Sequence, residues 1–156
     1  MKYSLTIVTD KPNLWKDSDP IHPGLDVDFK TTQGRGVFGL KGDDGKWKAF
    51  MCYARTTRVP QDLEELIATT DLTGTVIVPY TVWSHEKGAG RTIVNKVIEY
   101  VCSGKAGPDV QRVVTLSPQT IMARKFHIRN NAKELQVNSE TVNFEYEVKN
   151  EKRRSS

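Results

Sequence analysis

Alternating hydrophobic and polar positions predict strands near both ends of the chain. The alternation in residues 3–8 predicts a first strand. Two β-prone runs, 37–40 and 46–53, flank an Asp-Gly turn, which is the usual signal of a two-stranded hairpin. The runs 135–137 and 142–148 alternate on either side of a short polar turn and predict a second hairpin. We therefore expect antiparallel pairing at both ends.

The middle of the chain begins with a strand followed by a helix. Residues 75–82 are β-prone, and the segment 91–103 repeats its apolar residues with a helical period. Gly104 is expected to end this helix, because glycine readily adopts the left-handed conformation found at helix ends. The apolar positions of the predicted helix are Val94, Val97, Ile98 and Val101.

A second strand and helix follow. The run 111–116 is apolar and β-prone, and Ser117-Pro118 reads as a helix cap with proline at the first helical position. This helix is expected to reach about Arg129, where the pair Asn130-Asn131 can close it. The strand–helix–strand order requires a right-handed parallel crossover, so the sheet is expected to be mixed, in an α/β (α+β) fold.

The N-terminal half also contains one predicted short helix and one segment without an assignment. Pro60 is expected to open a short helix in which Leu63, Leu66 and Ile67 share one face. Residues 11–36 are rich in Pro, Asp and Gly and receive no assignment. Long irregular segments in compact domains often carry function. Their scattered apolar residues are Trp15, Leu25, Val27 and Phe29.

The length of the chain favours a single domain, and its charge favours a small anionic ligand. The 156 residues are expected to form a single domain over 1–150, followed by a basic, disordered tail at 151–156. The formal net charge is +4, of which the last ten residues supply +2 (four Lys or Arg against two Glu). The remaining mild charge suits a small polyanion and gives no sign of a nucleic-acid partner.

The cysteines and the first residues suggest a location. Cys52 and Cys102 lie within apolar runs, where they give neither a disulfide framework nor metal-ligand spacing, so no metal is expected. A reducing compartment suits them. The apolar run in residues 3–8 is too short for a signal peptide or a membrane span, so we expect a cytoplasmic protein. Monomer and homodimer both remain open.

A glycine-rich turn between the strand 75–82 and its helix indicates an anion site. Gly88 and Gly90 have no side chains, so main-chain N–H groups can close around a phosphate at the positive end of the helix. Lys87 and Arg91 add two cations at the same place. A dinucleotide-binding loop would need a third glycine where Ile93 stands, and a Gly-Lys-Ser/Thr phosphate loop is absent.

Two motifs resemble those of the Gcn5-related N-acetyltransferase (GNAT) family. The family's loop, Arg or Gln, two residues, Gly, one residue, then Gly or Ala, is matched by residues 85–90, although His85 replaces Arg or Gln. A later Ala-x-x-Phe-Tyr motif is matched by 123–127, although His127 replaces Tyr, and Asn131-Ala132 follows it. The resemblance covers about residues 75–148, and it is to small bacterial and bacteriophage-encoded members.

The resemblance implies a fold and a cosubstrate. It implies a mostly antiparallel mixed sheet with helices on both faces and a splayed central pair of strands, and a site for acetyl-CoA. The pyrophosphate would lie on the loop, and the arm of the cofactor would pair with the strand edge and contact the second helix. The implied cofactor-binding residues are Tyr80, Thr81, Val82, His85, Lys87, Gly88, Ala89, Gly90, Arg91, Thr92, Thr120 and Phe126.

The implied activity is direct transfer of an acetyl group to an amine acceptor of unknown identity. A lysine-type amine has a pKa of about 10.4, so a general base is expected at neutral pH. Asp26, Asp28, His22 and a water chain ending on Tyr80 as a relay all remain possible. His127 is expected to be the general acid, because the pKa of a histidine can be tuned near the working pH.

Two other functions remain open. Because His85 and His127 depart from the family pattern, the chain could be an acyl-CoA-binding module that has lost turnover. Alternatively, it could be an acetyltransferase associated with nucleic acid, which predicts strongly salt-dependent binding to transfer RNA. For a phage-encoded member, the expected location is the cytoplasm of the host.

Overall fold

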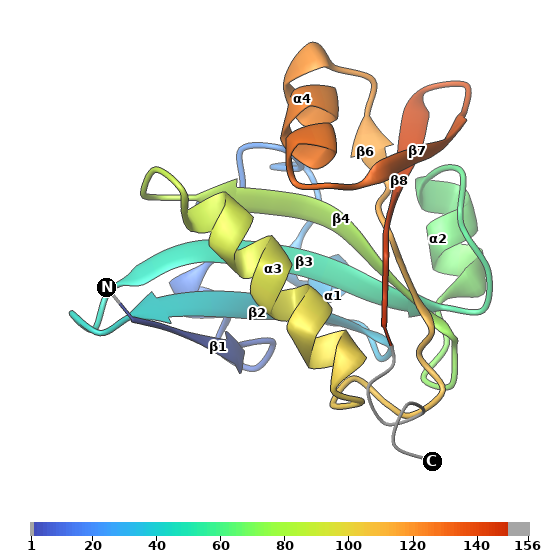
Figure 1. Cartoon of the computed structure of the whole chain (residues 1–156). Helices are drawn as coiled ribbons and strands as arrows, with labels where there is room; N and C mark the ends of the chain where they lie inside the picture. The colour runs from blue at the N-terminus through green and yellow to red at the C-terminus, as the bar shows by residue number, and fades with distance from the viewer. Residues whose placement is uncertain (1, 150–156) are drawn as a thin grey trace.

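The computed structural model describes residues 2–149, which form one eight-stranded sheet with helices on both faces (Figure 1). The predicted basic tail, residues 151–156, lies outside the described residues. The elements are β1 (Tyr3–Ile7), the 3-10 helix η1 (Pro12–Leu14), α1 (Val27–Thr31), β2 (Arg35–Gly42), β3 (Trp47–Thr56), α2 (Leu63–Thr69), β4 (Val76–Ser84), α3 (Ala89–Cys102), β5 (Arg112–Val114), β6 (Ser117–Pro118), α4 (Ile121–Arg129), β7 (Lys133–Val137) and β8 (Thr141–Tyr146).

The sheet is mixed, as predicted. Its strand order is β1-β2-β3-β4-β5-β8-β6, and β7 pairs with β8 beside this path. Only β4 and β5 run parallel, joined by the crossover through α3, and every other described pair is antiparallel. Both predicted hairpins are confirmed, as β2–β3 and β7–β8.

Two hydrophobic cores lie on opposite faces of the sheet. The helix α3 covers one face, and α1 and α2 lie on the other side (Figure 1). In the first core α3 contributes buried valines that pack against Phe38, Met51 and Phe144. In the second, Trp15 and Leu66 pack against Phe50. Because β4 supplies buried residues to both cores, its position is fixed from both sides.

The helix α3 starts two residues before its predicted first residue. Gly88 occupies its N-cap position with a φ of 85°, in the left-handed region that favours glycine. No side chain caps this end of the helix. The predicted apolar face is confirmed: Val94, Val97 and Val101 are buried, and Gly104 follows the helix with a φ of 82°.

The predicted start of the last helix at Ser117-Pro118 is wrong. These two residues form β6, which pairs with Val142 and Thr141 of β8. The helix α4 instead begins at Ile121, because the Thr120 hydroxyl accepts a hydrogen bond from the Ala123 main-chain N–H at 3.1 Å. At the other end Asn130 and Asn131 close the helix as expected, and Asn131 has a positive φ of 74°.

Two further details of the sequence reading are wrong. Asp62, not Pro60, precedes the first residue of α2, and its carboxylate accepts from the Glu65 main-chain N–H at 2.8 Å. Ile67 does not share the buried face of α2 with Leu66, because 53% of its surface is exposed. The irregular segment 11–36 also holds η1 and the short helix α1.

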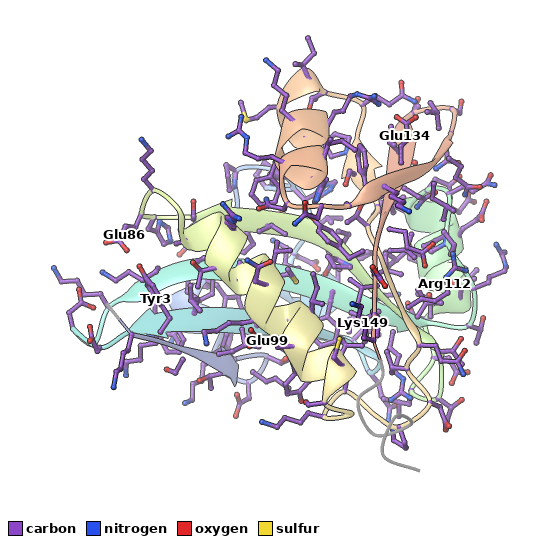
Figure 2. All side chains as sticks on the ribbon, in the orientation of Figure 1. Tyr3, Glu86, Glu99, Arg112, Glu134 and Lys149 are labelled. Atoms are coloured by element: carbon purple, nitrogen blue, oxygen red, sulfur yellow. The ribbon has the colours of Figure 1, made fainter. Side chains whose placement is uncertain are left out.

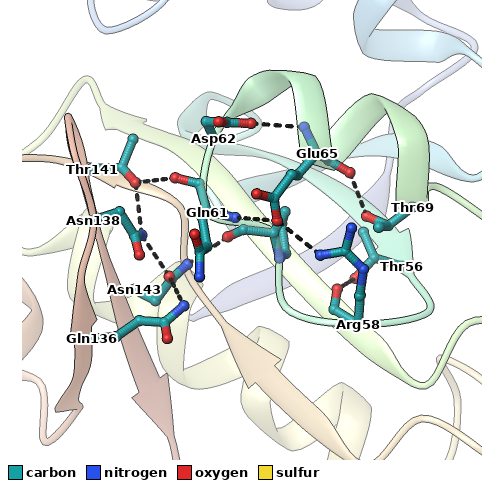
Figure 3. Close-up of polar contacts among 11 residues, drawn as sticks. Thr56, Arg58, Gln61, Asp62, Glu65, Thr69, Gln136, Asn138, Thr141 and Asn143 are labelled. Carbon is teal, nitrogen blue, oxygen red and sulfur yellow. Dashed lines mark hydrogen bonds and ion pairs between the residues drawn. The ribbon is translucent and has the colours of Figure 1, made fainter.

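Buried polar contacts tie the β7–β8 hairpin to the segment before α2 (Figure 3). The Asn143 side chain is fully buried and donates to the carbonyls of Pro60 at 2.9 Å and Thr115 at 2.8 Å. The Thr141 hydroxyl donates to the carbonyl of Gln61. These contacts fix β7 and β8 against the rest of the sheet, and β8 in turn pairs with Ser117 and Pro118 of β6, which line the candidate site.

Candidate functional site

The two central strands diverge, as the resemblance implied. β4 and β5 pair only at Val76 and Ile77, and the Leu116 main-chain N–H then donates to the Pro79 carbonyl at 3.0 Å. Beyond that bond the chain turns to β6 and pairs with β8 instead. The remaining length of β4 therefore has a partner on one side only.

A cavity of about 570 Å³ occupies the space where the strands separate. Its walls come from β4, from the segment that leads into α4, from α4 itself and from the N-terminal segment at Ile21 and His22. No carboxylate, lysine or arginine of the described chain lines it. The lining residues are Ile21, His22, Pro79, Tyr80, Thr81, Val82, Trp83, Ser84, Gly90, Leu116, Ser117, Pro118, Thr120, Met122, Ala123, Phe126 and His127.

A β-bulge turns the main chain of β4 toward this cavity. Cys52 pairs with Thr81 and the next residue of β3 pairs with Pro79, so Tyr80 is the extra residue. The His85 main-chain N–H donates to the Lys48 carbonyl at 2.8 Å. Because an antiparallel ladder alternates, Val82 directs its N–H and C=O away from β3. Val82 therefore offers a free strand edge to a ligand.

The glycine loop offers main-chain donors, but fewer than predicted. Within residues 2–149, the N–H groups of Gly88, Gly90 and Arg91 have no hydrogen-bond acceptor. In contrast, the Ala89 N–H donates to the Glu86 carbonyl at 3.1 Å. The Thr92 N–H donates to the Gly88 carbonyl at 3.2 Å. The Ala89 and Thr92 amides are therefore already used within the protein, which leaves those of Gly88, Gly90 and Arg91 for an anion.

Contacts with β1 and β3 hold this loop in place. The Glu86 carboxylate accepts a hydrogen bond from the Tyr3 hydroxyl at 3.3 Å, and both residues are labelled in Figure 2. Glu86 also lies 3.4 Å from the Lys48 ammonium. Lys48 also pairs with Asp44 at 2.8 Å, and this hydrogen bond is the main cause of its raised pKa. Glu86 is thus held by β1 and β3 rather than by the loop's free amides.

The charged residues of the loop face solvent. Lys87 and Arg91 are exposed, and neither has an ion-pair partner among residues 2–149. His85 is also exposed, and its ring meets the ring of Phe50 edge-on at 6.0 Å. These three predicted cofactor residues lie outside the cavity wall.

The predicted residues of α4 do reach the cavity. Thr120 and Phe126 line it, and Phe126 packs over the start of α3. A Cβ atom at Gly90 would lie 3.3 Å from Phe126 Cε2, so glycine is what permits this close approach. Met122 lines the cavity with 82% of its surface exposed. Its role was missed because its sequence context gives no motif.

Tyr80 and Thr81 line the cavity, but their side chains have other environments. The Tyr80 hydroxyl is buried without a hydrogen-bond partner in the described chain, and burial raises its pKa. The relay role predicted for Tyr80 therefore stays a prediction. The Thr81 hydroxyl donates to Asp19 at 3.0 Å. The Thr81 hydroxyl therefore links this wall to Asp19 and does not donate into the cavity.

The predicted pKa of His127 near the working pH is wrong. Burial lowers the pKa of His127 to about 4, so the imidazole is neutral at pH 7. It is 7% exposed, and its ring stacks on Phe144 at 5.1 Å. Its nitrogens lie 3.2 Å from Ser117 Oγ and 2.7 Å from the Tyr146 hydroxyl. Both ring nitrogens of His127 therefore already have hydrogen-bond partners within the protein.

The burial of His127 predicts a pH-dependent loss of stability. The unfolded chain takes up a proton near the ordinary pKa of about 6.5, whereas the folded chain does so near 4. Between these values the unfolded state binds more protons, so the free energy of unfolding falls as the pH falls. Between pH 7 and pH 4.5 we expect a loss of about 2.5 kcal/mol from this residue. In urea unfolding at pH 7 and 4.5, the free energy of unfolding of His127→Gln should fall less between the two pH values than that of the wild type. An equal fall in both proteins would contradict this.

A buried ion pair missed in the sequence holds the N-terminal wall. Lys30 Nζ lies 2.8 Å from Asp19 Oδ2, and both side chains are 2% exposed. The other Asp19 oxygen accepts from the main-chain N–H groups of Ile21 at 2.8 Å and His22 at 3.1 Å. Burial opposes ionisation of Asp19, but the hydrogen bonds from Lys30, His22 and Ile21 outweigh it and lower its pKa.

Of the three side chains proposed as the base from the sequence, only His22 reaches the cavity. It is half-buried, and burial lowers its pKa, so its imidazole is neutral at pH 7. Asp26 is exposed and caps α1 by accepting from the Phe29 main-chain N–H at 2.8 Å. Asp28 is exposed and also lies outside the cavity wall.

Residues 2–149 bring together no group of three or more side chains suited to hold a metal ion. None of the helices described in this range has the length and hydropathy needed to cross a bilayer.

The fold is similar to those of solved GNAT-type structures. The GphF GNAT-like decarboxylase in complex with isobutyryl-CoA has a TM-score of 0.68 at 13% identity, covering 94% of this chain and 99% of that one. The loading GNATL domain of CurA from Lyngbya majuscula has a TM-score of 0.64 at 15% identity, covering 94% and 98%. The Campylobacter jejuni N-acetyltransferase PseH in complex with acetyl coenzyme A has a TM-score of 0.59 at 11% identity, covering 94% and 99%.

No protein-family model and no curated protein sequence matches this chain. The similarity is therefore one of structure at low sequence identity, and it establishes a GNAT fold. The cavity, the free edge at Val82 and the open amides of Gly88, Gly90 and Arg91 together meet the requirements of a long ligand with an anionic end.

Proposed function

We propose that this protein is an acyl-CoA-dependent N-acyltransferase that uses acetyl-CoA. The observation that carries the proposal is the cavity between the diverging strands, which begins beside uncapped helix amides and runs along a free strand edge. The neighbours PseH and GphF, which bind acetyl coenzyme A and isobutyryl-CoA with the same fold, support this ligand class.

The protein has a separate set of groups for each part of the acyl donor, acetyl-CoA. The N–H groups of Gly88, Gly90 and Arg91 would hold the pyrophosphate, with each hydrogen bond to a charged oxygen worth about 1.5–3 kcal/mol. The exposed Lys87 adds a cation at the same end. The free N–H and C=O of Val82 would pair with the amides of the cofactor arm. When bound, the cosubstrate supplies an acyl group on a thiol leaving group.

His22 is the proposed general base. It is neutral at pH 7 and borders the cavity, so it can take a proton from an attacking amine. Asp19 fixes its position through the His22 main-chain N–H, at 3.1 Å. A neutral histidine suits this role better than a lysine or tyrosine, since it can accept a proton without first losing one.

The cavity also limits the acceptor. Its described wall carries no carboxylate, which a polycationic amine would need as a partner. It also carries no lysine or arginine, which the free carboxylate of a malonyl group would need. We therefore propose an amine with an apolar body as the acceptor, and an uncharged acyl group on the donor.

Thermal unfolding with acetyl-CoA tests the donor assignment. A ligand present at 100 times its dissociation constant should stabilise the protein by ~2.7 kcal/mol, and free acetate should give no shift. Absence of a shift with acetyl-CoA would contradict the proposal. A shift without thiol release across a panel of amines would favour a binding module. Release of carbon dioxide from malonyl-CoA would favour a decarboxylase, the activity of GphF.

A further inference from the structure

Four buried side chains form one hydrogen-bonded row beside the cavity. Thr115 Oγ1 lies 2.8 Å from Ser117 Oγ, and Ser117 Oγ lies 3.2 Å from His127 Nε2. At the other end, His127 Nδ1 lies 2.7 Å from the Tyr146 hydroxyl oxygen. All four residues are at most 7% exposed. Only Ser117 and His127 line the large cavity.

The available hydrogen-bond acceptors determine which atoms of this row carry the protons. Within residues 2–149 the Tyr146 hydroxyl has one possible acceptor, His127 Nδ1. The His127 proton is then on Nε2, where it is donated to Ser117 Oγ. Thr115 Oγ1 accepts from the Phe144 main-chain N–H at 3.1 Å, and within residues 2–149 its own proton has one possible acceptor, Ser117 Oγ.

The opposite orientation would leave a buried proton without an acceptor. If Ser117 donated to His127, the imidazole would donate to Tyr146, and the Tyr146 proton would have no acceptor in the described chain. If Ser117 donated to Thr115, the Thr115 proton would be orphaned instead. Unsatisfied buried donors are costly, so the first orientation is preferred. The low pKa of His127 agrees, because an imidazolium has no lone pair for Tyr146.

In the preferred orientation Ser117 accepts two hydrogen bonds, and its own proton has no acceptor within residues 2–149. Because Ser117 lines the cavity, that proton is left for a ligand there. We propose that Ser117 is a catalytic hydrogen-bond donor that stabilises the negative charge gathering on the thioester sulfur as the acyl group leaves. His127 and Tyr146 are positioning residues that keep the Ser117 proton directed outward. This assignment rests on the proposed acyl-CoA-dependent function.

The transfer step then balances without a protein acid. A bond forms between the amine nitrogen and the acyl carbon, the carbon–sulfur bond breaks, and its electron pair stays on the sulfur. His22 takes the proton that the nitrogen loses and returns it to water. Ser117 keeps its proton and donates a hydrogen bond to the thiolate, which is protonated by water after release. Ser117 thus replaces the acid expected at His127.

The bound CoA thiol itself provides a test that does not need the acceptor. Free thiols have a pKa of about 8.5, and a hydrogen bond to a charged atom is worth about one pKa unit. The pKa of the thiol of bound CoA can be measured by ultraviolet absorbance of the thiolate, with desulfo-CoA as the blank. We expect this pKa to be about one unit lower in the wild-type protein than in Ser117→Ala. Ser117→Thr, which keeps a hydroxyl, should retain most of the shift.

Two more variants separate this role from a structural one. Tyr146→Phe leaves Ser117 in place but removes the donor that fixes the His127 tautomer, so the pKa shift of bound CoA should shrink. The control Ser103→Ala removes a hydroxyl that donates to the Tyr100 carbonyl at the far end of α3, and should change nothing at the thiol. In turnover, Ser117→Ala should lower kcat by about 10²–10³ with KM unchanged.

The outcomes are distinct. If the wild-type protein and Ser117→Ala bind CoA with the same thiol pKa, the role of Ser117 is overturned and the proposed function stands. If the wild-type protein binds no CoA, both are overturned. A lower thiol pKa in the wild-type protein and in Ser117→Thr, but not in Ser117→Ala, supports the assignment.

Discussion

Replacing His22 by alanine is expected to lower kcat by about 10²–10⁴, the usual contribution of a general base. His22 is the side chain on the cavity wall that is neutral at pH 7 and not already enclosed by other side chains. Because His22 is not among the groups proposed to hold the pyrophosphate or the cofactor arm, a thermal shift with acetyl-CoA should persist in the variant. The measurement is thiol release from acetyl-CoA with an amine that supports turnover.

The pH dependence of the wild-type protein should point to the same residue. Burial lowers the pKa of His22, so the acid limb of the kcat/KM profile should fall below the ordinary histidine value of about 6.5. Asp28→Asn is the matched control, because Asp28 is exposed and lies outside the cavity wall, and its profile should match the wild type. Full turnover in His22→Ala would rule out His22 as the base.

Lys30→Met is expected to lower the free energy of unfolding by about 3–5 kcal/mol. The substitution keeps much of the volume of the side chain but leaves the Asp19 carboxylate, 2% exposed, without its counter-charge. Urea unfolding monitored by tryptophan fluorescence gives the value, since Trp83 lies close to Lys30, whose Nζ is 5.8 Å from its ring centroid. A loss below about 1 kcal/mol, the range of a surface pair, would contradict the assignment.

Two companion variants make the result specific. The double variant Asp19→Asn, Lys30→Met removes both charges, and it should recover much of the lost stability because no buried charge is left uncompensated. Lys16→Met, at an exposed lysine without an ion pair in the described chain, should stay within about 0.5 kcal/mol of the wild type.

The sequence predicted those features whose cause is local. The glycine-rich sequence placed Gly88 in the turn before α3, and the structure gives it a φ of 85°, which glycine readily adopts. The apolar spacing of α3 predicted its buried face, and the Asp-Gly turn predicted the β2–β3 hairpin. The mixed sheet followed from the order of these elements.

The features that the sequence did not predict correctly depend on residues distant in the sequence. Ser117 before Pro118 is a good local helix signal, but pairing with Val142 of β8 takes priority, and Thr120 caps α4 instead. The low pKa of His127 comes from burial that only the packing of β8 against α4 creates. No local pattern joins Asp19 to Lys30, because their contact needs the fold of the segment that the sequence left unassigned.

The short ladder between β4 and β5 has a consequence for the order of assembly. The β2–β3 hairpin closes a small loop, whereas the parallel contact forms only after the whole of α3 has folded back, at a greater entropy cost. Since the cavity exists only after this late step, a ligand there makes its contacts with the completed chain alone. Acetyl-CoA should therefore slow spontaneous unfolding and leave the refolding rate nearly unchanged.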